Sequence, residues 1–195
     1  AKRLGFAGPT PNSIHAISER DDIIATLSAT TMVMLHLSRY AEDWIIWSSP
    51  ECGFVSLDES VSTGSSMMPQ KKNPDSLELI RGKSARAIGH LTAILTLVKG
   101  LPLTYSRDLQ EDKEPMIAAL TDTIDCVTLM QDVVATMTWH TKRMEQSIEG
   151  GLLATDVADY LTRKGLPFRQ AHDVAAKIVR ASLDEQSDFR TWTLK

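Results

Sequence analysis

The chain has 195 residues, of which 43% are hydrophobic, and a formal net charge of −4. This length allows one domain plus part of another, with a substantial buried core. The slight acidity argues against a nucleic-acid partner, because such proteins carry strongly basic surfaces. No apolar run approaches the roughly 20 residues of a membrane helix and no secretory signal is visible, so we expect a cytoplasmic protein with no membrane partner. The two cysteines, Cys52 and Cys126, lack metal-ligand spacing and are expected to be reduced thiols.

Three long segments place apolar residues at the three- and four-residue spacing of a helix. They run over about residues 22–47, 74–99 and 115–137. Ser48-Ser49-Pro50 ends the first segment, and Gly100 ends the second. Helices of roughly 23 to 26 residues are typical of a bundle. Apolar residues also cover more than one face of each helix, which predicts that helices from other copies of the chain pack against them.

The pattern changes after Gly150-Gly151. Two shorter helices are predicted there, at about residues 155–163 and 168–183. We place a domain boundary near residue 145, so that residues 1–145 form a helical bundle and residues 146–195 a smaller helical domain. Strand-like alternation is confined to a possible short hairpin around Phe54 to Leu57. The sequence therefore predicts an all-α fold.

Residues 62–74 read Ser-Thr-Gly-Ser-Ser-Met-Met-Pro-Gln-Lys-Lys-Asn-Pro and combine groups suited to an anion. They supply a conformationally free glycine, two hydroxyls, two cations and a helix start with Asn as its cap, at Gly64, Ser65, Ser66, Lys71, Lys72 and Asn73-Pro74. Free amides at a helix N-terminus favour an anion, and nearby lysines strengthen that preference. The segment therefore predicts a carboxylate or phosphate site. The alternative is a Gly-Ser linker beside solvated lysines.

The pattern Gly64-Ser65-Ser66-x-Met68-Pro69-x-Lys71-x-Asn73-Pro74 resembles the signature loop of the fumarase, aspartase and argininosuccinate lyase superfamily. Within this superfamily, other segments are similar to argininosuccinate lyases, namely Ser18 to Asp21, Tyr105 to Lys113, and Thr155 to Leu161 with Phe168-Arg169. The resemblance covers almost all of the chain. It implies the long-helix bundle of the superfamily's central domain, followed by a smaller helical C-terminal domain.

The resemblance implies a carbon–nitrogen lyase that cleaves argininosuccinate to arginine and fumarate through a carbanion, as a step in arginine biosynthesis. It implies a homotetramer held by a central bundle of long helices, in which loops of three subunits build each active site. It implies no metal or organic cofactor. The family chain is considerably longer, and this chain lacks an initiator Met and the family's upstream Thr-His motif. We therefore expect a C-terminal fragment that is inactive in isolation.

The resemblance also implies roles for particular residues. Ser65 is the catalytic serine, with Lys71 and the loop amides stabilising its alkoxide, and Ser66 is the weaker alternative. Whether Ser65 removes the proton from carbon or delivers one to the leaving group stays open. Glu78 orients the upstream histidine, as a carboxylate does for a general base. Substrate binding is implied for Thr63, Met68, Lys71, Asn73, Tyr105, Gln110 and Lys113.

Plainer interpretations exist for the same residues. Alone, Glu78 is a helix-surface acid, residues 105–113 are a solvated connection, and Arg20 either positions carboxylates or pairs with neighbouring acids. Two other functions also stay open. One is a non-catalytic scaffold, like the lens crystallins that keep this fold. The other is a sister fumarate-releasing lyase (adenylosuccinate lyase, fumarase or aspartase), against which the Tyr105 to Lys113 segment argues.

Overall fold

The computed structural model describes residues 2–68, 71–148, 150–189 and 192. The chain forms two compact units, Ala1–Trp139 and His140–Lys195. The predicted boundary near residue 145 lies slightly further along, close to the end of the short helix α5 (Thr141–Gln146). Each unit is helical, as the sequence predicts.

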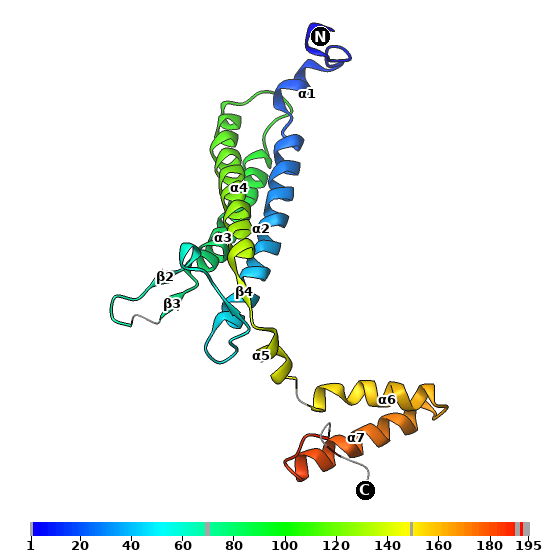
Figure 1. Cartoon of the computed structure of the whole chain (residues 1–195). Coiled ribbons are helices and arrows are strands. Elements are labelled where there is room, and N and C mark those ends of the chain that lie inside the picture. The colour runs from blue at the N-terminus through cyan, green and yellow to red at the C-terminus, as the bar shows by residue number, and fades with distance from the viewer. Residues whose placement is uncertain (1, 69–70, 149, 190–191, 193–195) are drawn as a thin grey trace. The chain divides into compact units, whose positions relative to one another are not determined.

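Three long helices make up most of the first unit: α2 (Asp21–Ser48), α3 (Asp75–Val98) and α4 (Lys113–Thr136). Each helix packs against the other two, and consecutive helices run in opposite directions (Figure 1). Their bounds confirm the three predicted segments to within about two residues, the ordinary uncertainty of helix ends. The all-α bundle is therefore confirmed.

The core of this bundle is built from a seven-residue repeat on each helix. The repeat places the same helix face toward its neighbours every two turns, as in the packing of coiled coils. The buried positions are Leu27, Met34 and Ala41 on α2, Ile80, Ala87 and Ile94 on α3, and Ala119, Cys126 and Val133 on α4. Cys52 and Cys126 are free thiols, and burial raises the pKa of the Cys126 thiol.

Other faces of the same helices expose large apolar side chains. They include Met32, Leu35 and Tyr40 on α2, Leu79, Ile88 and Leu95 on α3, and Ile117, Ile124 and Val134 on α4. A single three-helix unit leaves this apolar surface in water, which is unfavourable in proportion to its area. The surface agrees with the expectation that further helices cover the bundle.

Two short β-ribbons close one end of the bundle (Figure 1). In the first, β1 (Val55–Ser56) pairs antiparallel with β4 (Thr138–Trp139). The predicted hairpin at residues 54–57 was therefore wrong, because the partner strand follows α4 and local alternation carries no information about it. The second ribbon is a hairpin of β2 (Thr63–Gly64) and β3 (Lys72–Asn73), and it was not predicted.

Short helical segments complete the first unit. Helix α1 (Ser13–Ser18) starts where the side-chain oxygen of Asn12 accepts the N–H groups of Ile14 and His15, at 3.0 and 3.2 Å. The 3₁₀ helices are η1 (Lys2–Leu4), η2 (Glu59–Val61) and η3 (Arg107–Asp112). None of these elements was predicted, since each is too short to show a period.

The second unit is a helix hairpin. Helices α6 (Ala154–Arg163) and α7 (Phe168–Asp184) match the two predicted helices and follow η4 (Gly150–Leu153). Small side chains at Ala158, Ala171 and Ala175 are buried where the two helices meet. Gly165, at φ 97°, makes the turn between them, an angle that favours glycine. Over the part of the chain described here, no helix has the length and apolar character needed to cross a membrane.

Candidate active site

The serine loop, residues 63–73, projects from the bundle as the β2–β3 hairpin (Figure 1). Thr63 pairs with Asn73 in the ribbon, so these two predicted substrate-binding residues lie side by side. Gly64 lies in the extended strand and does not adopt a positive φ, contrary to the backbone freedom expected of it. A Cβ added at Gly64 would meet nothing within 4 Å, so the space beside the ribbon is open to a ligand. Pro69 and Gln70, at the loop tip, lie outside the described residues.

Ser65 forms a local turn at the start of the loop tip. Its Oγ accepts the backbone N–H groups of Met67 and Met68, each at 3.2 Å. Two amides directed at one oxygen favour the negatively charged form of that oxygen. The side chain of Ser65 is half-buried, whereas Ser66 is exposed. The loop amides thus reach the serine for which the resemblance implies catalysis.

The lysines of the loop differ in their surroundings. Lys72 Nζ lies 3.5 Å from Glu59 Oε1, so its charge has a partner. Lys71 is exposed, and among the described residues no carboxylate pairs with it. Its backbone N–H donates to the carbonyl of Met68 at 3.0 Å, and the Met68 side chain is about half exposed. Lys71 is therefore the loop cation that is available to an anionic ligand.

The start of α3 differs from the prediction. Its first-turn cap is Pro74, without a side-chain hydrogen bond, so the assignment of Asn73 as the cap was wrong. Asn73 is extended because it pairs in β3. The hairpin is tied to α3 instead by the buried hydroxyl of Ser76, which donates to the carbonyl of Val61 at 2.5 Å. Glu78 lies exposed in the first turn of α3, where a side chain is free to meet a group from elsewhere.

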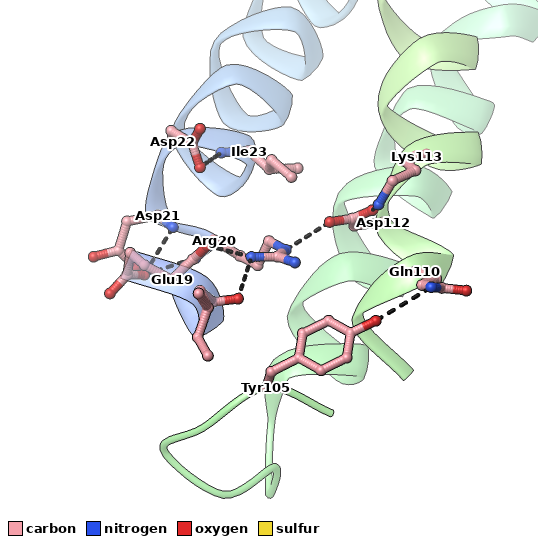
Figure 2. Close-up of polar contacts among 10 residues, drawn as sticks. Glu19, Arg20, Asp21, Asp22, Ile23, Tyr105, Gln110, Asp112 and Lys113 are labelled. Carbon is pink, nitrogen blue, oxygen red and sulfur yellow. Dashed lines mark hydrogen bonds and ion pairs between the residues drawn. The ribbon is translucent and has the colours of Figure 1, made fainter. Parts of the chain in front are cut away.

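A second group of predicted residues lies on η3 and at the start of α4. The side-chain amide of Gln110 donates to the hydroxyl of Tyr105 at 3.2 Å, so these two are brought together (Figure 2). The ammonium of Lys113 donates to Asp112 Oδ1 at 2.7 Å. Tyr105, Gln110 and Lys113 are all exposed. The exposed cation, amide and phenol of this segment are each able to bind a carboxylate or an amino-acid group.

The sequence did not lead us to predict that Asp112 anchors this second group. Asp112 is 3% exposed, and its Oδ2 accepts a hydrogen bond from Arg20 Nε at 2.5 Å. For Arg20, the pairing with an acid is thus the interpretation that holds. Leu109 is also buried, and residues three apart share one face of a 3₁₀ helix. That Leu109–Asp112 spacing is the one sequence signal that could have indicated a buried acid.

The two groups lie at opposite ends of the bundle (Figure 1). The serine loop precedes α3 and the Tyr105–Lys113 segment follows it. Helix α3 has 24 residues, which at 1.5 Å per residue is a length of roughly 36 Å. One copy of the bundle therefore does not bring Ser65 and Lys71 to Tyr105 and Lys113.

Solved structures of lyases have the same fold as this chain. The structure is similar to that of EDDS lyase in complex with formate, with a TM-score of 0.85 and 33% identity over 98% of this chain and 38% of that one. An EDDS lyase variant with bound fumarate gives a TM-score of 0.84 at 32% identity, over 98% of this chain and 38% of that one. The family model described as "Lyase" matches residues 1–89. The fold is that of the fumarase/aspartase superfamily of lyases.

Relatives in sequence identify a narrower family within this class of lyases. Argininosuccinate lyases of Herpetosiphon aurantiacus and Schizosaccharomyces pombe are 54% and 52% identical over 92% of this chain and 40% and 39% of their own length. That of Thermus thermophilus is 48% identical over 100% of this chain and 42% of its own length. The family model "Argininosuccinate lyase C-terminal" matches residues 151–195. The chain belongs to the argininosuccinate lyase family, and it spans about 40% of the length of these curated relatives.

Proposed function

We propose that the protein containing this chain cleaves argininosuccinate to arginine and fumarate. The observation that carries the proposal is the identity of 48% to 54% with argininosuccinate lyases across 92% to 100% of the chain. Matches over the whole chain include both the serine loop and the Tyr105–Lys113 segment. The proposal places the protein in arginine biosynthesis, in the cytoplasm.

The reaction removes a weakly acidic C–H proton next to a carboxylate and then expels the guanidino nitrogen. The carbanion increases the negative charge on that carboxylate, so preorganised donors lower the barrier. The exposed Lys71 ammonium is such a donor, and Lys71 directly precedes the ribbon strand in which Asn73 pairs with Thr63. Met68 belongs to the same loop. These four residues bind the succinyl part of the substrate in our proposal.

Ser65 transfers a proton in this reaction, either from the carbon or to the leaving guanidino nitrogen. A serine hydroxyl is a weak base unless its alkoxide is stabilised. The N–H groups of Met67 and Met68, both 3.2 Å from Ser65 Oγ, supply that stabilisation within the loop itself. Glu78, exposed at the start of α3, orients the histidine that the family carries upstream. These roles rest on the family resemblance together with the geometry of the loop.

Tyr105, Gln110 and Lys113 bind the amino-acid and carboxylate ends of argininosuccinate. Because these residues and the serine loop lie at opposite ends of one bundle, a complete site must combine loops of different copies. A homotetramer held by the long helices provides that combination, and it also covers the exposed apolar faces of α2, α3 and α4. The reaction needs no metal or organic cofactor.

Two other functions make different predictions. A crystallin-like scaffold would keep the bundle but release no fumarate. A sister lyase would act on adenylosuccinate, malate or aspartate instead, and a lyase with the specificity of EDDS lyase, to which the chain is 33% identical, would act on EDDS. The higher identity to argininosuccinate lyases favours our proposal.

The test is an absorbance assay for fumarate with the complete protein. We expect fumarate release from argininosuccinate and none from adenylosuccinate, malate, aspartate or EDDS at equal concentration. Release from another of these substrates would assign the protein to a sister lyase. A folded protein that releases fumarate from none of them would support the scaffold function.

A further inference from the structure

Asp112 is the one charged residue among the buried residues of the ranges that the structure describes, with 3% of its surface exposed. An ionised carboxylate that has left water must be compensated by cations and hydrogen bonds. Asp112 lies between the predicted binding residues Gln110 and Lys113, yet it faces inward while they face outward. The interpretation of residues 105–113 as a solvated connection therefore does not account for the burial of Asp112.

The two oxygens of Asp112 receive two different cations (Figure 2). Arg20 Nε lies 2.5 Å from Oδ2, and Lys113 Nζ lies 2.7 Å from Oδ1. The side chain of Arg20 is 15% exposed and that of Lys113 is 62% exposed. Arg20 is thus the internal partner of the carboxylate, and Lys113 is the partner at the surface.

Arg20 is itself held in place at the start of α2. Its guanidinium donates to the carbonyl of Glu19 at 2.6 Å, and its backbone N–H donates to Glu19 Oε1 at 2.8 Å. The same carboxylate oxygen of Glu19 accepts the N–H of Asp21 at 2.9 Å. These bonds hold Arg20 in position independently of its contact with Asp112, which is 92 residues away in the sequence. The pair therefore fastens the Tyr105–Lys113 segment to the start of α2.

At Asp112 itself, one carboxylate faces two cations, and the exposed one is Lys113. An ammonium has three N–H donors, and Asp112 takes one of them. The other two remain available at the exposed end of the side chain, on the segment that also carries Tyr105 and Gln110 (Figure 2). A carboxylate is the ligand that such a fixed cation suits best.

We propose that Asp112 is a positioning residue for the lyase reaction, a role that rests on the proposed function. Held by Arg20, its buried carboxylate fixes the ammonium of Lys113 where it binds a substrate carboxylate. Asp112 does not touch the substrate and acts through Lys113. The opposing interpretation is that the Arg20–Asp112 pair only stabilises the fold and that the Lys113 contact is incidental.

The first test compares buried Asp112 with partly buried Asp122 in the complete protein, both of which pair with two cations. Asp112→Asn is expected to raise the KM for argininosuccinate by at least about tenfold, with kcat within about threefold. Asp122→Asn is the matched control. Its carboxylate on α4 meets Lys83 Nζ at 2.5 Å and Arg86 at 3.1 Å, its side chain is 13% exposed, and it lies outside both groups of predicted site residues. At a temperature where both variants are folded, the control should keep the KM of the unmodified protein. Equal KM values in Asp112→Asn and the unmodified protein would overturn the positioning role.

The second test asks whether Asp112 acts through Lys113. In a Lys113→Met background, Asp112→Asn should raise KM no further, because the group that it positions is already absent. Additive effects of the two changes would overturn the proposal. If Asp112→Asn does not fold, Arg20→Lys gives the same comparison, since it keeps the charge but removes the Nε donor. A complete, folded protein that does not cleave argininosuccinate would overturn the proposed function and this role with it, whereas an active protein with unchanged KM in the variants overturns this role alone.

Discussion

The hydroxyl oxygen of Ser65 has hydrogen-bond donors that an ordinary surface serine lacks. An ordinary serine oxygen donates and accepts hydrogen bonds with water, whereas Ser65 Oγ accepts two backbone N–H groups from its own turn. Because these donors are fixed by the loop, they require no reorganisation when negative charge develops on the oxygen. The neighbouring Ser66 lies within the same turn, but its side chain is exposed. The structure therefore separates two serines that are adjacent and identical in the sequence.

We predict that Ser65→Ala in the complete protein lowers kcat for argininosuccinate cleavage by about 10²-fold or more, because a methyl group fits the loop but transfers no proton. Circular dichroism should show an unchanged helix content. Ser66→Ala is the matched control and should keep most of the activity. If the Ser66 variant loses activity and the Ser65 variant keeps it, the catalytic role passes to Ser66.

A second prediction concerns Lys71→Met, which keeps much of the side-chain length and removes the charge. If the ammonium stabilises charge that builds up in the transition state, kcat should fall together with kcat/KM. Lys72→Met is the control, since Lys72 is paired with Glu59 and not assigned to the substrate. Steady-state kinetics separate the outcomes, and a rise in KM alone would make Lys71 a residue that binds substrate and transition state equally.

At the scale of single residues, the burial of Asp112 is the feature that was hardest to predict from the sequence. The polar run of residues 105–113 is typical of a solvated connection, because five of its members are charged, and only the three-residue spacing between Leu109 and Asp112 distinguishes the buried one. What buries Asp112 is a cation 92 residues earlier in the chain. In contrast, the family resemblance predicted binding roles for the exposed residues Tyr105, Gln110 and Lys113. Their roles stay predictions.

At the scale of elements, the long helices were predictable because packing and sequence share one period. Buried positions recur every seven residues on each helix, so the apolar pattern itself locates α2, α3 and α4. Elements that depend on a remote partner were not predictable in this way. Strand β1 pairs with β4 across the whole of α3 and α4, and the Thr63–Asn73 pairing takes Asn73 out of its expected capping position.

Helix α3 offers a direct test of its two faces. Ile94 is fully buried, and the adjacent Leu95 is 48% exposed. We expect Ile94→Ala to lower the free energy of unfolding of the 195-residue chain by about 2–5 kcal/mol, through lost burial and the cavity left behind. At a protein concentration at which the chain is monomeric, Leu95→Ala should cost less than about 1 kcal/mol, because Leu95 is then exposed. Urea unfolding followed by circular dichroism measures both, and equal losses would contradict the assignment of Leu95 to the outer face.

At the scale of the whole molecule, two features point to more than one copy. The predicted site residues form two groups separated by the length of α3, and large apolar side chains remain exposed on all three long helices. A symmetric assembly accounts for both features, because it covers the apolar faces and brings one end of a bundle to the opposite end of another. The sequence predicted the excess of apolar surface. The separation of the two groups became visible only in the fold.

The final prediction follows from this division of the site. The 195-residue chain, expressed alone, should associate through its apolar faces but cleave no argininosuccinate, because identical chains cannot supply the family's upstream histidine that none of them carries. The complete protein with Ser65→Ala should also be inactive, since it keeps the histidine and lacks the hydroxyl. Refolding the two together should restore part of the activity in mixed oligomers, in which the serine loop of one chain meets the histidine of another. Fumarate absorbance measures all three samples, with size-exclusion chromatography to confirm mixed assembly. Cleavage by the pure 195-residue chain would show that its own residues complete the site and would contradict the shared arrangement.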